Sequence, residues 1–251
     1  NKSNLKKGEN MANNPMFNEA AFERAQESAR AVQPMTLQGT INKTFCLLFL
    51  CVVGAMFTWT NPQISGLAMG LSAIGAFVLA MVTFFKPSIS AFTAPIYALL
   101  EGVLLGAISA QYNAQFKGIV FNAVAITFLV FFAMLFIYRT KIIKVSRGLM
   151  IGIFSATLAI CVLYIGSFIL SLFGVSTAYL TSNSPLSIGI SVVVCIVAAL
   201  NFLLDFHFID EMTSRFAAPK YMEWYAAFSL MVTLVWLYIE ILQLLAKSQK
   251  R

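Results

Sequence analysis

The sequence predicts an all-α integral membrane protein that crosses the bilayer with seven transmembrane helices. Of its 251 residues, 59% are hydrophobic and 11% are charged, whereas soluble domains carry about 25% charged residues. The mean hydropathy is +0.82, and the apolar residues come in runs of about 20, the length that a helix needs to cross the hydrocarbon core. A soluble core of this size could not bury so much apolar surface, whereas lipid accepts it directly.

Seven apolar runs are candidate membrane spans. They cover residues 44–60, 64–85, 91–112, 118–138, 149–173, 186–206 and 224–246. Turn residues or charges separate them, in order Asn61-Pro62, Lys86-Pro87, residues 111–117, the basic stretch 139–147, the Ser-, Thr- and Asn-rich stretch 177–185, and residues 210–223. We therefore expect residues 1–42 to be a polar cytoplasmic N-terminal tail and residues 43–251 to form the seven-helix transmembrane domain.

The basic residues predict the orientation of the chain. Cytoplasmic loops of membrane proteins carry an excess of Lys and Arg. With the N-terminus in the cytoplasm, most of the 17 basic residues fall on the cytoplasmic side, and the outer loops contain only Lys117. The net charge of +7 thus reflects topology, and we expect no nucleic-acid partner. The exception is the C-terminal group Lys247, Lys250 and Arg251, which seven crossings place outside. The alternative is a last span that re-enters instead of crossing, which would leave this C-terminal tail in the cytoplasm.

The N-terminal tail has no apolar segment of the kind that a signal peptide contains. Residues 12–33 have the spacing of a short amphipathic helix with a weak apolar face, which predicts a solvated helix near the membrane surface. The four cysteines lie inside apolar runs without a CxxC pair. We expect them to be buried hydrophobic residues and not a disulfide or a metal site.

Ionisable residues inside membrane spans are costly and are therefore candidate functional groups. Glu101 lies about ten residues into the third span, near mid-membrane at about 1.5 Å per residue. Gly102 and Gly106 follow it as a GxxxG motif, which predicts close helix packing. The alternative is a protonated Glu101 that hydrogen-bonds to a neighbouring span, for example at Asn122 or Asn201.

Asp205 ends the sixth span, five residues before Asp210, so the two point in different directions on a helix. Asp205 is expected to point into the bundle, as a proton-sensitive latch or a cation ligand, while Asp210 meets the cytoplasmic interface. The alternative for Asp205 is a solvated helix-end carboxylate. His207, the single histidine, could join these carboxylates at a metal site, but we expect it simply to lie at the interface. Glu240, near the far end of the last span, is compatible with an interfacial position.

The sequence offers no known arrangement for membrane enzyme chemistry. One histidine excludes an HExxH zinc site, and the chain contains neither a GxSxG nucleophile motif nor a phosphate-binding Walker loop. We therefore expect no catalytic activity and no resident cofactor.

Several segments resemble the Bax inhibitor-1 family, in particular its bacterial branch. They are Met35-Thr-Leu-Gln-Gly-Thr-Ile-Asn-Lys-Thr, Ala94-Pro-Ile-Tyr-Ala-Leu-Leu-Glu-Gly, Asn201-Phe-Leu-Leu-Asp205-Phe-x-x-Ile209, Ala218-Pro-Lys-Tyr-Met-Glu-Trp-Tyr and Leu237-Tyr-Ile-Glu-Ile-Leu-Gln-Leu-Leu. The resemblance covers residues 34–246. It implies seven helices with the last helix central and wrapped by the other six, and a location in the bacterial inner membrane.

The resemblance also implies a pH-sensitive calcium leak, with calcium as the transported ion and a pair of aspartates on the last two helices as the latch. Asp205 matches the first aspartate, with Asn201 and His207 beside it, whereas Thr233 stands where the second is expected. Glu101 or Glu240 could supply the missing carboxyl. The alternative function is a membrane scaffold or regulator that binds other membrane proteins or proteases without ion flux.

Overall fold

The computed structural model of the protein describes residues 33–61, 65–174, 176, 180 and 182–249. Within them it contains seven helices that are long and apolar enough to cross a membrane, and no strand. They are α3 (Leu37–Thr60), α4 (Ser65–Phe85), α5 (Ser90–Gln115), α6 (Ile119–Arg139), α7 (Arg147–Leu172), α9 (Pro185–Ser214) and α10 (Met222–Gln249), with the short 3₁₀ helix η2 (Pro87–Ile89) before α5. The predicted all-α fold with seven spans is confirmed. The amphipathic helix expected at 12–33 lies outside the described residues except for Gln33.

Two helices, α3 and α9, extend by seven or more residues beyond the apolar runs that predict them. Helix α3 starts at Leu37 and not at residue 44, because the hydroxyl of Thr36 caps it by accepting from the Gly39 N–H (3.0 Å). Helix α9 continues past Phe206 to Ser214. Both extensions carry polar side chains, which a hydropathy pattern assigns to loops.

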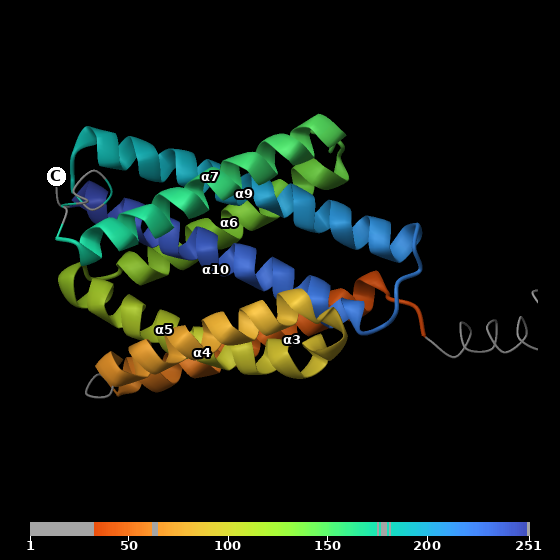
Figure 1. The fold of residues 1–251 in the computed structure, drawn as a ribbon, viewed down its shortest axis with the longest axis horizontal. Coiled ribbons are helices and arrows are strands. Elements are labelled where there is room, and N and C mark those ends of the chain that lie inside the picture. Colours follow the sequence, from red (N-terminus) through yellow and green to blue (C-terminus); the bar gives the residue numbers. More distant parts are fainter. Residues whose placement is uncertain (1–32, 62–64, 175, 177–179, 181, 250–251) are drawn as a thin grey trace, which may run out of the picture.

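The last helix is the centre of the bundle. Helix α10 runs through the middle of the molecule (Figure 1), and most of its apolar stretch is buried. It packs against α3, α5, α6 and α9, whereas α4 packs mainly on α5 and α7 mainly on α9. The expected central last helix is therefore confirmed, with four helices forming the main wall around it and α4 and α7 in outer positions.

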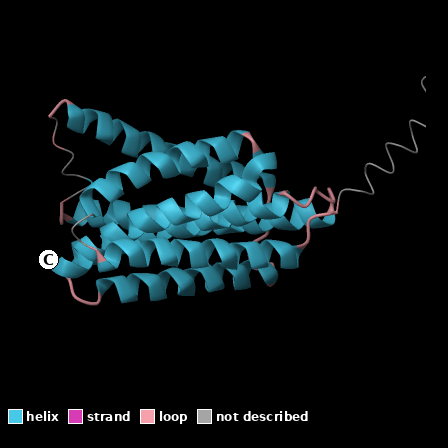
Figure 2. Cartoon of the chain, turned by 90° about the horizontal axis from the view of Figure 1, so that it is seen from below, coloured by secondary structure: helices cyan, strands magenta, loops and turns pink. Residues whose placement is uncertain are grey.

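Helix α10 crosses the bundle from end to end. It is continuous from Met222 to Gln249, and its C-terminal end lies at the opposite end of the bundle from the start of α3 (Figures 1 and 2). The alternative of a re-entrant last span is therefore wrong. Lys247 is also not part of a solvated tail, because it is buried and its ammonium donates to Ser191 Oγ at 2.7 Å.

One end of α10 is tied to the start of α3. The N–H and the hydroxyl of Thr36 both donate to Glu223 Oε1 (2.9 Å each), and the ammonium of Lys43 pairs with Glu223 Oε2. Glu223 is only 1% exposed. This α3–α10 clasp, made of Thr36, Lys43 and Glu223, fixes the central helix to the first one.

Helices α3 and α5 pack at backbone distance. A Cβ added at Gly102 would fall on the carbonyl oxygen of Cys51, and one added at Gly106 would fall on that of Ala55. The hydroxyl of Thr58 donates to the Val103 carbonyl oxygen across the same contact (2.9 Å). The close helix packing predicted from the GxxxG motif is thus confirmed.

We expect Gly102→Ala to destabilise the protein by about 1–3 kcal/mol, because α3 and α5 must move apart to admit the methyl group. Gly152→Ala is the matched control: nothing lies within 4 Å of a Cβ at Gly152 on α7, and alanine favours helix over glycine by about 1 kcal/mol. Thermal unfolding in detergent compares the two. Equal midpoints for both variants would contradict the packing argument.

Candidate functional site

Asp205 forms a buried polar link between α9 and α10. Its side chain is 8% exposed. Oδ1 accepts a hydrogen bond from the Ser229 hydroxyl and Oδ2 accepts one from the Thr233 hydroxyl, each at 2.6 Å. Ser229 and Thr233 are one turn apart on α10, so both hydroxyls reach the same carboxyl group. The prediction that Asp205 points into the bundle agrees with this geometry.

The link depends on the charge of Asp205. An ionised carboxylate only accepts hydrogen bonds, and bonds to a charged acceptor are about twice as strong as those between neutral groups. Protonation removes the charge and turns one oxygen into a donor, so one of the two hydroxyls must rotate to accept. The two hydrogen bonds between α9 and α10 are therefore strongest when Asp205 is ionised.

Neither of the two acids proposed as the missing latch carboxyl is brought to Asp205. Glu101 is buried on α5, 7% exposed, and among the described residues makes no hydrogen bond to Asp205, whose carboxyl oxygens accept from Ser229 and Thr233 instead. Glu240 lies seven residues after Thr233 on α10, about 10 Å further along the axis. Thr233 itself, however, contacts Asp205 from the helix where the second aspartate is expected.

The alternative partner suggested for Glu101 at Asn201 is wrong. The Asn201 amide donates instead to the Thr157 hydroxyl of α7 and to the Val197 carbonyl oxygen, both at 2.8 Å. Asn201 thus joins α9 to α7, one turn before Asp205 on α9.

Glu240 is an interior residue and not an interfacial one. It is 2% exposed. Oε1 accepts from the Tyr164 hydroxyl of α7 (2.8 Å) and from Trp236 Nε1 (3.2 Å), while Oε2 is buried without a hydrogen-bond partner in the described part of the chain. Trp236, one turn before Glu240 on α10, is half-buried and turned toward it by this contact. A buried carboxylate oxygen without a donor can accept from water or coordinate a cation.

A cavity of about 310 Å³ lies between α7, α9 and α10 and reaches Tyr164, the residue that donates to Glu240. Tyr164 lines it together with Ser171, Ser191, Gln243 and Lys247. Since Lys247 lies near the end of α10, the cavity leads from the C-terminal end of the bundle toward Glu240. The residues Thr233, Glu240 and Lys247 recur every seven positions and so lie on one stripe of α10.

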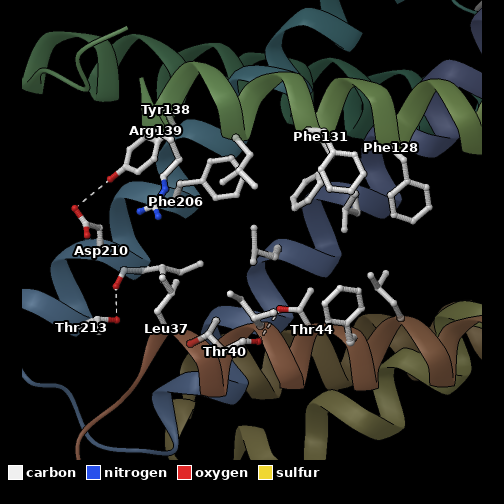
Figure 3. A pocket seen from close by; sticks show the side chains of 18 of the residues that line it. Leu37, Thr40, Thr44, Phe128, Phe131, Tyr138, Arg139, Phe206, Asp210 and Thr213 are labelled. Carbon is white, nitrogen blue, oxygen red and sulfur yellow. Dashed lines mark hydrogen bonds between the residues drawn. The ribbon is translucent and has the colours of Figure 1, made fainter. Parts of the chain in front are cut away.

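A second and larger cavity, of about 400 Å³, opens between α3 and α6, with α9 and α10 forming its floor. Figure 3 shows apolar side chains along most of its length, with Tyr138, Arg139, Asp210 and Thr213 together at one end. The Tyr138 hydroxyl donates to Asp210 Oδ2 (3.4 Å). Asp210 is exposed at this end, as expected of an interfacial residue.

The described residues contain no group of three His, Cys, Asp or Glu side chains that could hold a metal ion. His207 lies 3.8 Å from Glu211 one turn further along α9. Thus His207 and its neighbouring carboxylates do not assemble a metal site in this part of the chain.

Sequence reasoning missed polar partners of two of the buried acids, namely Ser229 for Asp205 and Tyr164 for Glu240. Their signal is weak, because Ser and Tyr are common in membrane spans. One sequence signal was available. Ser229 and Thr233 are one helical turn apart, so their hydroxyls could be expected to share one acceptor, the buried Asp205.

Comparison with known proteins agrees with the resemblance. The family model described as Bax inhibitor 1 like matches residues 14–250. No curated protein matches the chain. The match covers nearly the whole sequence, and the fold has the seven helices and the central last helix that the resemblance implies. The chain belongs to the Bax inhibitor 1 like family of membrane proteins.

Proposed function

We propose that this protein is a pH-sensitive cation leak, with calcium as the transported ion and Asp205 as the gate. The observation that carries the proposal is the buried Asp205 carboxyl group, which joins α9 to α10 through two neutral hydroxyls. Ionised, Asp205 pins the central helix and the pathway is closed. Protonated, it releases α10, so the leak increases as the pH falls. A tenfold change in the open fraction requires about 1.4 kcal/mol.

Glu240 and the cavity beside it provide the second half of the proposed pathway. The unpartnered Oε2 is a ligand for a passing cation, because carboxylate oxygens suit calcium. Lys247 at the far end of the cavity is a fixed positive charge that limits cation occupancy. The pathway therefore runs along the stripe of α10 that contains Thr233, Glu240 and Lys247.

We expect Glu240→Gln to reduce the leak about tenfold, equivalent to about 1.4 kcal/mol, because the amide coordinates a cation more weakly than the carboxylate. The pH dependence should remain, since Asp205 is untouched. Glu211→Gln, at the partly exposed ion pair with Arg215 (2.8 Å), is the control and should conduct like the parent. Loss of the pH dependence in Glu240→Gln would contradict the division of roles.

The test of the function itself is flux in pure protein. Liposomes that contain a calcium-sensitive dye and the reconstituted protein are compared with empty liposomes from about pH 6 to 8. A leak that exceeds that of empty liposomes and rises toward acid pH supports the proposal. A parent protein no leakier than empty liposomes at any pH refutes it and favours the alternative, a scaffold for other membrane proteins or proteases.

We further propose that the protein lies in a bacterial inner membrane with the N-terminus in the cytoplasm, and that it catalyses no reaction. The support for the orientation is that basic residues gather at one end of the bundle. Lys43 and Lys220 lie there with the start of α3, and Arg139 lies there at the mouth of the larger cavity. Basic residues mark the cytoplasmic side of a membrane protein. Labelling of single cysteines in the 139–147 loop from either side of the membrane tests the orientation.

A further inference from the structure

The cavity between α3 and α6, here named the α3–α6 groove, is an apolar slot on the lipid-facing side of the bundle. Phe45 and Leu48 of α3 form one wall, Phe128 and Phe131 of α6 form the other, and Leu230 and Leu234 of α10 form the floor. Figure 3 shows side chains of α3, among them Thr40 and Thr44, facing Phe128 and Phe131 of α6 across the opening.

The groove opens toward hydrocarbon. Phe45 is 68% exposed and Phe132, also in the lining, is 58% exposed, on helices that span the membrane. Water in an apolar slot at this depth would lose hydrogen bonds without replacement. The groove therefore suits an acyl chain, and its polar end determines which lipid it accepts.

The polar end combines two opposite charges that do not pair with each other. Arg139 and Asp210 both line it, but no ion pair within 4.0 Å joins them among the described residues. Among the described residues, the Asp210 carboxylate accepts only the long contact from Tyr138 (3.4 Å), and Asp210 is exposed. The guanidinium of Arg139 matches a phosphate with two parallel hydrogen bonds, and the carboxylate of Asp210 needs a cationic N–H donor.

Phosphatidylethanolamine carries both groups on one headgroup. Its phosphate accepts from Arg139, and its ammonium donates to Asp210. Phosphatidylcholine has the same net charge but no N–H, and phosphatidylglycerol has the phosphate but no cation. The charges at the mouth therefore distinguish three lipids whose acyl chains are identical.

We propose that the α3–α6 groove is a phosphatidylethanolamine site, with one acyl chain in the slot and the headgroup between Arg139 and Asp210. The acyl chain then contacts Leu230 and Leu234, which directly follow Ser229 and Thr233 on α10. A bound lipid thus packs against the part of α10 whose hydroxyls donate to Asp205. The site goes beyond the proposed leak, and binding is measured without flux.

The experiment is native mass spectrometry of the full chain with an equimolar mixture of the three chain-matched lipids. The parent should retain phosphatidylethanolamine above the other two. Arg139→Gln should lose it about tenfold, the effect expected for one charge-assisted hydrogen bond, and Leu48→Trp should block the slot. Asp210→Asn should abolish the preference for phosphatidylethanolamine over phosphatidylcholine while some binding remains.

Two control variants separate the site from general lipid association. Lys144→Gln removes a charge in the same basic loop outside the groove, and Phe57→Trp enlarges an exposed side chain on another face of α3. Both should bind like the parent. The proposal is overturned by equal loss in Lys144→Gln, by a parent preference for phosphatidylglycerol, or by a parent that retains none of the three lipids.

Discussion

Asp205→Asn is expected to abolish the pH dependence of the calcium leak and to leave the protein open at every pH tested. Asparagine preserves the shape of the side chain and one acceptor oxygen, but it never carries the charge that strengthens the bonds from Ser229 and Thr233. In the proposed mechanism the parent is closed at higher pH, where the carboxylate is ionised, and opens as the pH falls. The variant should therefore leak at higher pH about as fast as the parent does at lower pH.

The measurement is dye-reported uptake into liposomes at several pH values, with Glu211→Gln as the control that should keep the parent profile. Two further variants sharpen the result. Ser229→Ala combined with Thr233→Val removes both donors and should also open the gate. Thr233→Asp places a second carboxyl beside Asp205 and should make the pH dependence steeper. An Asp205→Asn protein with the parent's pH profile would show that another group is the sensor.

Glu223→Ala is expected to destabilise the fold more than any surface change. Without the carboxylate, the Thr36 N–H and the Lys43 ammonium lose their common acceptor. Breaking a buried ion pair costs about 3–5 kcal/mol, and we expect the lower end, about 3 kcal/mol, because Lys43 is 17% exposed and can reach water.

The control for the α3–α10 clasp is Glu211→Ala, which breaks the i,i+4 pair with Arg215. Arg215 is 72% exposed, and such exposed pairs contribute about 0–1 kcal/mol. Thermal unfolding in detergent should therefore separate the two alanine variants clearly. If Glu223→Ala unfolds at the same temperature as Glu211→Ala, the clasp does not stabilise the bundle. Glu223→Gln, which keeps an acceptor for Thr36, should fall between the parent and Glu223→Ala.

The seven spans could be predicted because hydrophobic run length reflects bilayer thickness, a constraint that acts on each helix separately. Helix rotation is different, since it depends on which neighbours a helix meets. Glu240 illustrates the point: near the end of a span it could be interfacial, and it is buried because α10 is surrounded by other helices.

Among the acids, the sequence predicted the orientation of Asp205 best. Asp205 lies near the end of an apolar run, and its spacing from Asp210 places the two side chains on different faces of α9. Its partners are on α10, more than 20 residues further along the chain. The sequence does not show which turn of α10 lies beside Asp205, and the packed structure does. The polar start of α3 and the polar end of α9 were not predicted, because a hydropathy pattern assigns polar helical turns at the membrane interface to loops.

The central position of α10 has a consequence for biogenesis. Proteins are made from the N-terminus, so the six other spans of the described chain emerge before the helix they surround. Until α10 arrives, Asp205, Tyr164, Ser191 and Lys43 have none of their α10 partners. Before α10 inserts, these polar groups need other partners, such as water or lipid headgroups. Insertion of α10 then supplies all four of their α10 partners with one helix.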